Sequence, residues 1–272
     1  MHCIVPEAEE ILDKEYSVLD HGFVRLVDYL GSDQRIVQSA RVSYGEGTKT
    51  YRQDKGLINY LMRNDHTSPF EQVVFTFHVK MPIFVARQWT RHRTARMNEI
   101  SGRYSVMKDE VYIPEADNIA LQSEDNKQGR ASEPVDPATA AAVREMMAED
   151  TKRTFESYHK LLDMGIAREI SRIDLPLSLY TEFYWEIDLH NLFHFLKLRL
   201  DNHAQFEIRQ YAVVMLEIIR RVCPIATEAF ENHKLKGRSF SGREMEAIKA
   251  MLNGEECPLE KREKEIFLDK LK

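Results

Sequence analysis

Cysteine is scarce in this sequence, and long apolar runs are absent. Only three cysteines occur among the 272 residues, and Cys3, Cys223 and Cys257 are too far apart to form a CxxC motif. Their odd number and wide separation argue against a disulfide framework, which favours a reducing cytoplasm. No stretch approaches the roughly 20 apolar residues that a membrane-spanning helix needs. The first residues also lack the basic and apolar regions of a signal peptide, so we expect a cytoplasmic protein without a membrane partner.

Glycine-rich phosphate loops are also missing. The sequence contains neither GxGxxG nor a Walker A motif, which argues against Rossmann and P-loop chemistry. It also lacks the GxSxG nucleophile elbow of the α/β-hydrolases. The formal net charge of −6 argues against nucleic-acid partners, which usually bind strongly basic domains. A local cluster of basic residues is therefore informative, and it favours a small phosphate over a DNA backbone.

The pattern of apolar residues predicts a mixture of helices and strands. Apolar residues make up 43% of the chain and charged residues 30%, which is ordinary for a soluble globular protein. Period-two spacing predicts strands over 21–30, 73–81 and 175–187, and residues 103–113 have extended character. Helices are predicted over 32–44, 55–65, 82–93, 136–163, 167–174, 189–200, 203–222 and 241–252. Because the two kinds of element do not alternate regularly, we expect an α+β fold.

Local signals place several helix ends. The predicted N-caps are Ser32 or Asp33, Asp136, Asp188 and, in a capping box with Glu244, Ser241. The predicted stops are Gly165, Pro224 and Gly254. No repeat or linker divides the chain, so we expect a single-domain protomer over 1–235 with a helical C-terminal extension over 236–272. Residues 117–135 are polar and poor in aromatic residues, which predicts a mobile loop.

One segment, RHRTARMNEISGRY at 91–104, gathers arginines in an acidic protein. Arg87, Gln88 and Arg91 are three and four residues apart, so they share one side of the predicted helix. Beyond it, Arg93 and Arg103 lie in irregular chain, where free amides and guanidinium forks together suit a phosphate. The alternative is a solvated charged face. No lysine occurs from 81 to 107, although lysines normally fill such a face, and this favours the phosphate site.

A second set of polar residues lies on the predicted helix 189–200. His190 and His194 are four residues apart, a spacing that suits a metal, but no third ligand is close by, so we expect no metal. The alternative is that both are polar residues flanking an apolar stripe. Arg199 borders the same stripe, where a charge is costly unless paired. Its own alternative is a side chain that extends to the surface near the helix end.

The spacing of the arginine-rich segment resembles a family signature. Arg91-His92-Arg93, followed after seven residues by Ser101, is similar to the RHR-x7-S signature of the flavin-dependent thymidylate synthases. The flanking segments SPFEQVVFTFHVKMPIFVARQWTRHR and NEISGRYS agree with it, and the resemblance covers roughly residues 20–235, apart from 117–135. It implies a twisted, mostly antiparallel sheet flanked by helix groups. It also implies a homotetramer whose active sites combine residues of several subunits.

The resemblance implies a reaction as well as a fold. It implies reductive methylation of dUMP to dTMP, with 5,10-methylenetetrahydrofolate as carbon donor and FAD, reduced by NADPH, as hydride source. The other route to thymidylate uses a cysteine nucleophile, and none of the three cysteines lies in a candidate site segment. Two alternatives remain open. One is another folate- and flavin-dependent methylation of a uracil, for example in RNA, and the other is a nonenzymatic nucleotide-binding module.

The resemblance also implies roles for individual residues. The dUMP-binding residues would be Gln88, Trp89, Arg91, Glu99, Ile100, Ser101, Gly102, Arg103, Arg172 and Arg199. The FAD-binding residues would be Ser43, Ser68, Arg91, His92, Arg93, Glu99, Asp188, His190 and His194. The catalytic candidates are Arg199, which would stabilise charge on the uracil ring, Ser101, which would position the ligand, and His66. Arg96 matches no fixed position of the motif, so we expect it at the surface.

Overall fold

An antiparallel sheet organises the protein. The structure, a computed structural model, describes residues 4–42, 51–124 and 127–272. Within these residues the main sheet has five strands in the order β1-β2-β3-β7-β4, and each neighbouring pair is antiparallel. The strands are β1 (Glu15–Val18), β2 (Gly22–Leu30), β3 (Val74–Pro82), β4 (Arg96–Glu99) and β7 (Tyr180–Asp188). The α+β fold expected from the sequence is confirmed.

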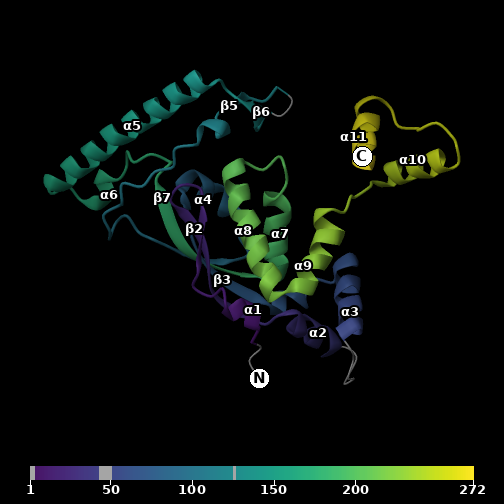
Figure 1. Ribbon diagram of the computed structural model, residues 1–272. Coiled ribbons are helices and arrows are strands. Elements are labelled where there is room, and N and C mark those ends of the chain that lie inside the picture. Colours follow the sequence, from purple (N-terminus) through teal and green to yellow (C-terminus); the bar gives the residue numbers. More distant parts are fainter. Residues whose placement is uncertain (1–3, 43–50, 125–126) are drawn as a thin grey trace.

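One face of the sheet is buried under helices. Alternate residues of β3 and β7, among them Phe77 and Trp185, are buried. Helices α4 (Ile83–Trp89), α7 (Leu189–Arg199) and α8 (Phe206–Val222) pack on the sheet (Figure 1). At the centre, the ring of Trp89 lies 5.1 Å from Trp185 and 4.6 Å from Phe195, measured between ring centroids. This aromatic cluster fixes the C-terminal end of α4 against α7.

The remaining helices lie around this core. They are α1 (Pro6–Glu9), α2 (Asp33–Arg41), α3 (Tyr51–Arg63), α5 (Pro137–Asp163), α6 (Arg168–Ser171), α9 (Pro224–Phe230), α10 (Gly242–Leu252) and α11 (Lys261–Leu271). Short 3-10 turns occur at Phe70–Gln72 and Ala116–Asn118, and a π-helical turn at Glu231–Leu235 follows α9. None of the helices described is long and apolar enough to cross a membrane.

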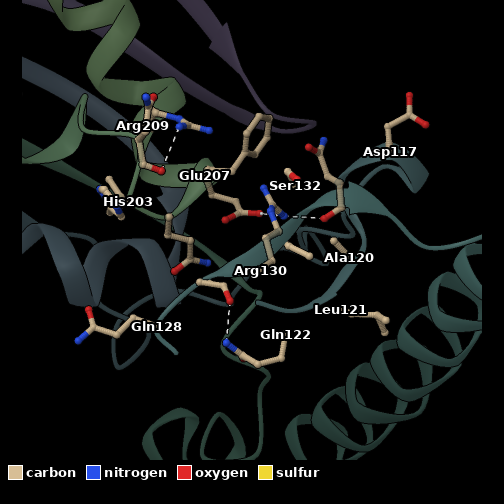
Figure 2. A pocket seen from close by; sticks show the side chains of 17 residues that line it. Asp117, Ala120, Leu121, Gln122, Gln128, Arg130, Ser132, His203, Glu207 and Arg209 are labelled. Carbon is tan, nitrogen blue, oxygen red and sulfur yellow. Dashed lines mark hydrogen bonds and ion pairs between the residues drawn. The ribbon is translucent and has the colours of Figure 1, made fainter. Parts of the chain in front are cut away.

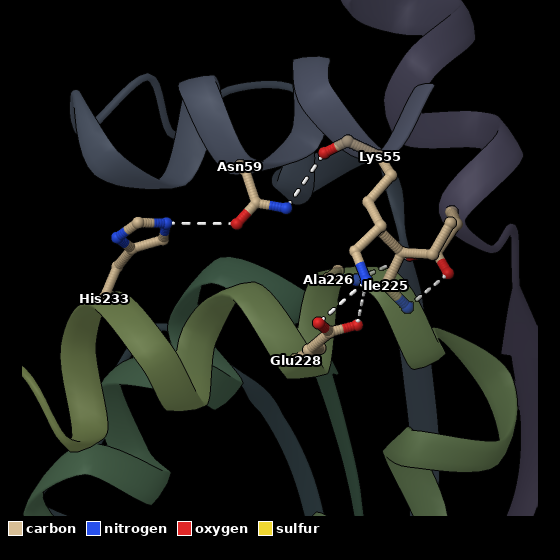
Figure 3. A network of polar contacts seen from close by, with 7 residues as sticks. Lys55, Asn59, Ile225, Ala226, Glu228 and His233 are labelled. Atoms are coloured by element: carbon tan, nitrogen blue, oxygen red, sulfur yellow. Dashed lines mark hydrogen bonds and ion pairs between the residues drawn. The ribbon is translucent and has the colours of Figure 1, made fainter. Parts of the chain in front are cut away.

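A polar network joins α3 to α9 (Figure 3). Lys55 donates to both carboxylate oxygens of Glu228 at 2.8 and 2.7 Å, and Asn59 is 3.1 Å from the ring of His233. At the start of α9, the amides of Ile225 and Ala226 donate to the carboxylate of Asp33 at 2.8 and 2.9 Å. Asp33 thus satisfies two amides that the helix itself leaves unpaired. These contacts hold α2, α3 and α9 together.

The predicted caps are confirmed, because they depend only on neighbouring residues. The side chains of Ser32, Asp136 and Asp188 each accept a backbone amide of the helix that follows, and Ser241 and Glu244 form the capping box. Gly165 and Gly254 have φ of 78° and 80°, the left-handed conformation expected of glycine after a helix. Pro224 does end α8, but it also begins α9.

Several predicted boundaries are wrong. Helix α4 ends at Trp89 rather than at residue 93, and Thr90 donates its hydroxyl to the Arg87 carbonyl at the helix end. Residues 96–99 form the edge strand β4 instead of irregular chain. Residues 117–135, predicted as a mobile loop, contain two paired strands, β5 (Ala120–Gln122) and β6 (Arg130–Pro134), while their mobility stays a prediction. Residues 103–113 contribute only an isolated bridge, between Val111 and Leu179.

Two glycines, Gly22 in β2 and Gly56 in α3, lie in crowded and open surroundings respectively. A Cβ atom at Gly22 would lie 2.1 Å from the hydroxyl of Tyr211 and 2.6 Å from the Val18 carbonyl oxygen. We expect Gly22→Ala to lower the free energy of unfolding by about 1–3 kcal/mol, the usual cost of overpacking. Gly56 lies in α3 with nothing within 4 Å of a built Cβ, so Gly56→Ala should raise stability by about 0.5–1 kcal/mol. Urea unfolding of both variants measures this, and equal effects would contradict the packing described.

Candidate functional site

Arg199 joins the ends of α4 and α7. Its Nε donates to Nε2 of His92 at 3.1 Å, and its Nη2 donates to the backbone carbonyl of Gln88 at 3.2 Å. No carboxylate pairs with Arg199 within the described part of the chain, and burial lowers its pKa. Because both acceptors are neutral, the positive charge of the guanidinium is not compensated. A half-buried cation of this kind is suited to an anionic group of a ligand.

His92 is neutral in this arrangement. An arginine Nε always carries a hydrogen, so the Nε2 atom of His92 must accept, and the proton of the ring lies on Nδ1. Burial, followed by the charges of Arg199 and His194, lowers the pKa of His92 to about 4. The ring packs 4.8 Å from Phe195 and 5.9 Å from His194, between centroids. The RHR segment therefore has a neutral residue between two cationic ones.

Three histidines line a cavity of about 160 Å³ next to this group. His66 approaches from the turn after α3, and His190 and His194 approach from α7. Phe193 and Phe230, stacked at 4.4 Å, form part of its apolar wall. The sequence contains no signal that would bring His66 to α7, because more than a hundred residues separate them. The described residues form no group of three His, Cys, Asp or Glu that could hold a metal.

A further cluster joins the segment after β4 to α6. Arg172 lies so close to Gly102 that a Cβ built there would meet its Cδ at 3.0 Å and its Nη1 at 3.2 Å. Arg103 donates from Nε to Glu169 at 2.9 Å, and Arg168 donates to the Tyr104 carbonyl at 3.1 Å. The exposed Arg172 guanidinium thus lies at Gly102, and that of Arg103, the next residue, forms an ion pair with Glu169. This geometry suits a phosphate, which needs several donors and a close approach of the backbone.

Ser101 and the two residues before it hold the same segment in place. The hydroxyl oxygen of Ser101 accepts the amide of Arg103 at 3.2 Å, and among the described residues no base is bonded to that hydroxyl. This agrees with a positioning role, because a serine nucleophile needs an activating base. Glu99 accepts the hydroxyl of Thr181 at 2.5 Å, and the amide of Ile100 donates to the Glu182 carbonyl at 3.0 Å. These bonds attach the end of β4 to β7.

The structure changes the assignment of several residues. Trp89 is completely buried, so its ring packs in the core. Asp188 uses both carboxylate oxygens to cap α7 through Asn191, which gives it a structural role. Arg91 lies beyond the end of α4, so it does not share a helix face with Gln88. Ser43 lies outside the described residues.

The other members of the arginine cluster are exposed. The side chains of Arg91 and Arg93 make no ion pair within the described ranges, and Ser68 is also exposed. Arg96 forms an ion pair with Glu186 while its side chain remains 80% exposed, as expected for a surface residue. Nor does any hydrogen bond or ring contact described join the Arg103–Arg172 cluster to Arg199. One chain therefore presents two separate cationic groups.

Sequence reasoning missed a larger cavity, of about 740 Å³, between the β5–β6 hairpin and the start of α8 (Figure 2). Glu207 is 4% exposed there, and it accepts from Tyr112 at 3.2 Å and from Arg130 at 3.4 Å. Gln205 lines the cavity and accepts a hydrogen bond from the side chain of Gln88. The one sequence feature that could have indicated this cavity is Glu207, a charged residue next to the apolar Ile208 on a predicted helix. The hairpin thus lies next to the Arg199 group.

Comparison with known proteins gives matches over nearly the whole chain. A family model described as "Thymidylate synthase complementing protein" matches residues 25–225. A second, described as "Thymidylate synthase ThyX C-terminal domain", matches residues 239–272, where the sequence alone showed no resemblance. A Treponema denticola protein named "Flavin-dependent thymidylate synthase" is 61% identical, over 96% of this chain and 98% of its own length. A protein of the same name from Treponema pallidum is 58% identical, over 100% and 89%.

A solved structure agrees with these matches. It is described as a UMP/dUMP methylase PolB from Streptomyces cacaoi bound with 5-Br dUMP. Its sequence is 35% identical, the TM-score is 0.74, and the match covers 81% of this chain and 99% of that one. A second structure of the same methylase, bound with 5-Br UMP, has a TM-score of 0.71. The similarity therefore extends from sequence to fold.

We expect His92 to titrate at a pKa of about 4, well below the ordinary 6.5. NMR spectra of labelled histidine, assigned by comparison with His92→Gln, measure this. Since the unfolded chain binds the proton near 6.5 and the folded chain only near 4, this residue makes the protein less stable as the pH falls between those values. Arg199→Leu should raise the pKa of His92, because it removes a neighbouring positive charge. An unshifted His92, or one indifferent to Arg199, would contradict the arrangement.

Proposed function

This chain belongs to the flavin-dependent thymidylate synthase family, and from that membership we propose how its residues carry out the reaction. The activity is the reductive methylation of dUMP, with FAD as cofactor and no cysteine nucleophile. The observation that carries the proposal is the uncompensated charge of Arg199. We assign to Arg199 the stabilisation of negative charge on the uracil ring during the transfer, an electrostatic role in a partly desolvated site.

The Arg103–Arg172 cluster binds the phosphate of dUMP in this proposal. Arg172 beside Gly102, Arg103, which would exchange its bond to Glu169 for the phosphate, and the backbone at Gly102 supply the donors that a phosphate monoester needs. The hydroxyl of Ser101 orients the segment through the Arg103 amide. The full set proposed for the nucleotide is Gln88, Arg91, Glu99, Ile100, Ser101, Gly102, Arg103, Arg172 and Arg199. Trp89 is left out because it is buried.

The histidine-lined cavity and the exposed arginines fit a flavin cofactor. Arg91 and Arg93 are exposed cations suited to the anionic part of FAD, and the cavity of His66, His190 and His194 has a partly apolar wall suited to a ring. Bound FAD, reduced by NADPH, supplies the hydride that completes the methyl group. The residues proposed to hold it are Ser68, Arg91, His92, Arg93, Glu99, His190 and His194. Asp188 orients this group indirectly by capping α7.

We also propose that the active protein is a homotetramer with shared sites. Support comes from the separation of the two cationic groups, which the described part of a single chain does not bring into contact. A neighbouring subunit could place its Arg103 beside this chain's Arg199. Methylenetetrahydrofolate would lie near His66, where the turn after α3 borders the cavity. In this proposal NADPH reduces the FAD, and the protein acts in the cytoplasm.

The direct test is release of tritium from dUMP labelled at carbon 5, with methylenetetrahydrofolate, NADPH and FAD present. We expect release that depends on all three additions. UMP should be assayed beside dUMP, because the structural relative is described as a UMP/dUMP methylase. A preparation that binds no flavin and releases no tritium from either nucleotide would contradict the proposed function.

Arg199→Ala should reduce dTMP formation roughly 100- to 1,000-fold, the range typical for loss of one electrostatic donor at a reacting centre. Flavin absorbance of the purified variant should remain, because Arg199 is assigned to the pyrimidine. Arg153→Ala is the matched control, since Arg153 lies on α5 with an 80% exposed side chain. Normal turnover by Arg199→Ala would refute the role.

Cys223→Ala should retain activity. Cys223 is completely buried at the junction of α8 and α9, where its thiol has no access to a substrate. The expected change is a modest loss of stability from the deleted atom, without loss of turnover. Cys257→Ser, in the tail, is the matched control for the second described cysteine. A folded but inactive Cys223→Ala would restore a thiol mechanism.

A further inference from the structure

We propose that His92 is a positioning residue for Arg199, and that its Nε2 atom sets the direction in which the guanidinium faces the substrate. This inference rests on the proposed function, because it gives His92 a part in the role assigned to Arg199. It goes beyond contact with a flavin, which would use a different part of the imidazole ring. The bond at issue is Nε of Arg199 to Nε2 of His92, at 3.1 Å.

The geometry leaves Arg199 few other constraints. Within the described residues its only other hydrogen bond is from Nη2 to the Gln88 carbonyl, at 3.2 Å. A single bond through a terminal nitrogen would allow the planar group to rotate about that contact. The Nε and Nη2 donors lie on the same edge of the guanidinium, and two bonds from that edge together fix its plane. The remaining donors are then free for a ligand.

The chemical identity of the acceptor matters as much as its position. A carboxylate at the place of His92 would hold the guanidinium more strongly, but it would also neutralise the charge that an ionised pyrimidine needs. A neutral imidazole orients the guanidinium without neutralising its charge. The Gln88 carbonyl, near the C-terminal end of α4, is the second neutral acceptor. Both bonds therefore orient the cation and leave its charge available.

The core holds His92 rigidly enough for this role. Its amide donates to the Trp89 carbonyl at 3.0 Å, directly after α4 ends. Its ring lies 4.8 Å from Phe195, and Phe195 in turn lies 4.6 Å from the buried ring of Trp89. The buried cluster thus fixes the imidazole on one side, and the imidazole fixes Arg199 on the other. Phe195 and Arg199 are one helical turn apart on α7, so the same helix carries both contacts.

Three substitutions separate this role from others. His92→Phe keeps an aromatic ring against Phe195 but removes the acceptor. His92→Gln can place an amide oxygen near the position of Nε2, whereas His92→Asn can only reproduce an atom near Nδ1. With FAD and dUMP saturating, we expect kcat to fall about 10- to 100-fold in His92→Phe, as for loss of a charged hydrogen bond. We expect His92→Gln to keep most of the wild-type kcat, and His92→Asn to lose about as much kcat as His92→Phe.

A double-variant cycle tests whether His92 acts through Arg199. The dissociation constant of dUMP is measured for His92→Phe, for Arg199→Ala and for the double variant. We expect the double variant to bind dUMP as Arg199→Ala does, since His92 has nothing left to orient. Hydrogen exchange at Arg199 Nε, followed by NMR, should also be faster in His92→Phe than in the wild-type protein, which requires no turnover.

Three outcomes would overturn the inference. They are full kcat in His92→Phe, rescue by Asn rather than Gln, or additive losses in the double variant. Rescue by Asn would assign His92 to the flavin through Nδ1 instead. If the wild-type protein itself releases no tritium from dUMP, the proposed function fails instead, and the exchange measurement still decides whether His92 holds Arg199.

Discussion

A guanidinium group bound only by neutral acceptors is the interaction on which this site depends. Most half-buried arginines in proteins pair with a carboxylate, because an unpaired charge is costly away from water. Arg199 instead uses an imidazole and a backbone carbonyl. These two bonds satisfy donors of the guanidinium but leave its positive charge uncompensated. The stability given up by leaving a cation uncompensated can be recovered only when an anionic ligand binds.

The fold places this group by means of its aromatic core. Trp89 ends α4 inside the core, and the chain turns directly afterwards into the RHR segment. One residue earlier, the Gln88 carbonyl accepts from Arg199, and three residues later His92 accepts the second bond. Trp89, which the family resemblance placed in the binding site, thus positions that site from within the core. A ring packed among other rings holds the backbone on which the polar contacts depend.

Much of the fold could be predicted because its signals are local. Helix caps such as Asp136 and the period-two pattern of β3 depend on residues within one or two turns of chain. Strand β4 could not be found this way, since RMNE is exposed throughout and pairs with β7 by its backbone. The β5–β6 hairpin is attached to α8 through Arg130 and Glu207, which are far apart in sequence. Contacts of this kind leave no local pattern. Spacing alone grouped His190 with His194, and only the family resemblance added His66.

The central claim is that Arg199 holds a positive charge available for an ionised pyrimidine. The most direct measurement is the ultraviolet difference spectrum of bound 5-fluoro-dUMP, recorded across pH, because the ring of this analogue ionises more readily than that of dUMP. We expect the ring to ionise at a lower pH on the protein than in free solution, since a nearby cation favours the anionic form. A bound ring that ionises at the same pH as the free nucleotide, or at a higher one, would contradict it.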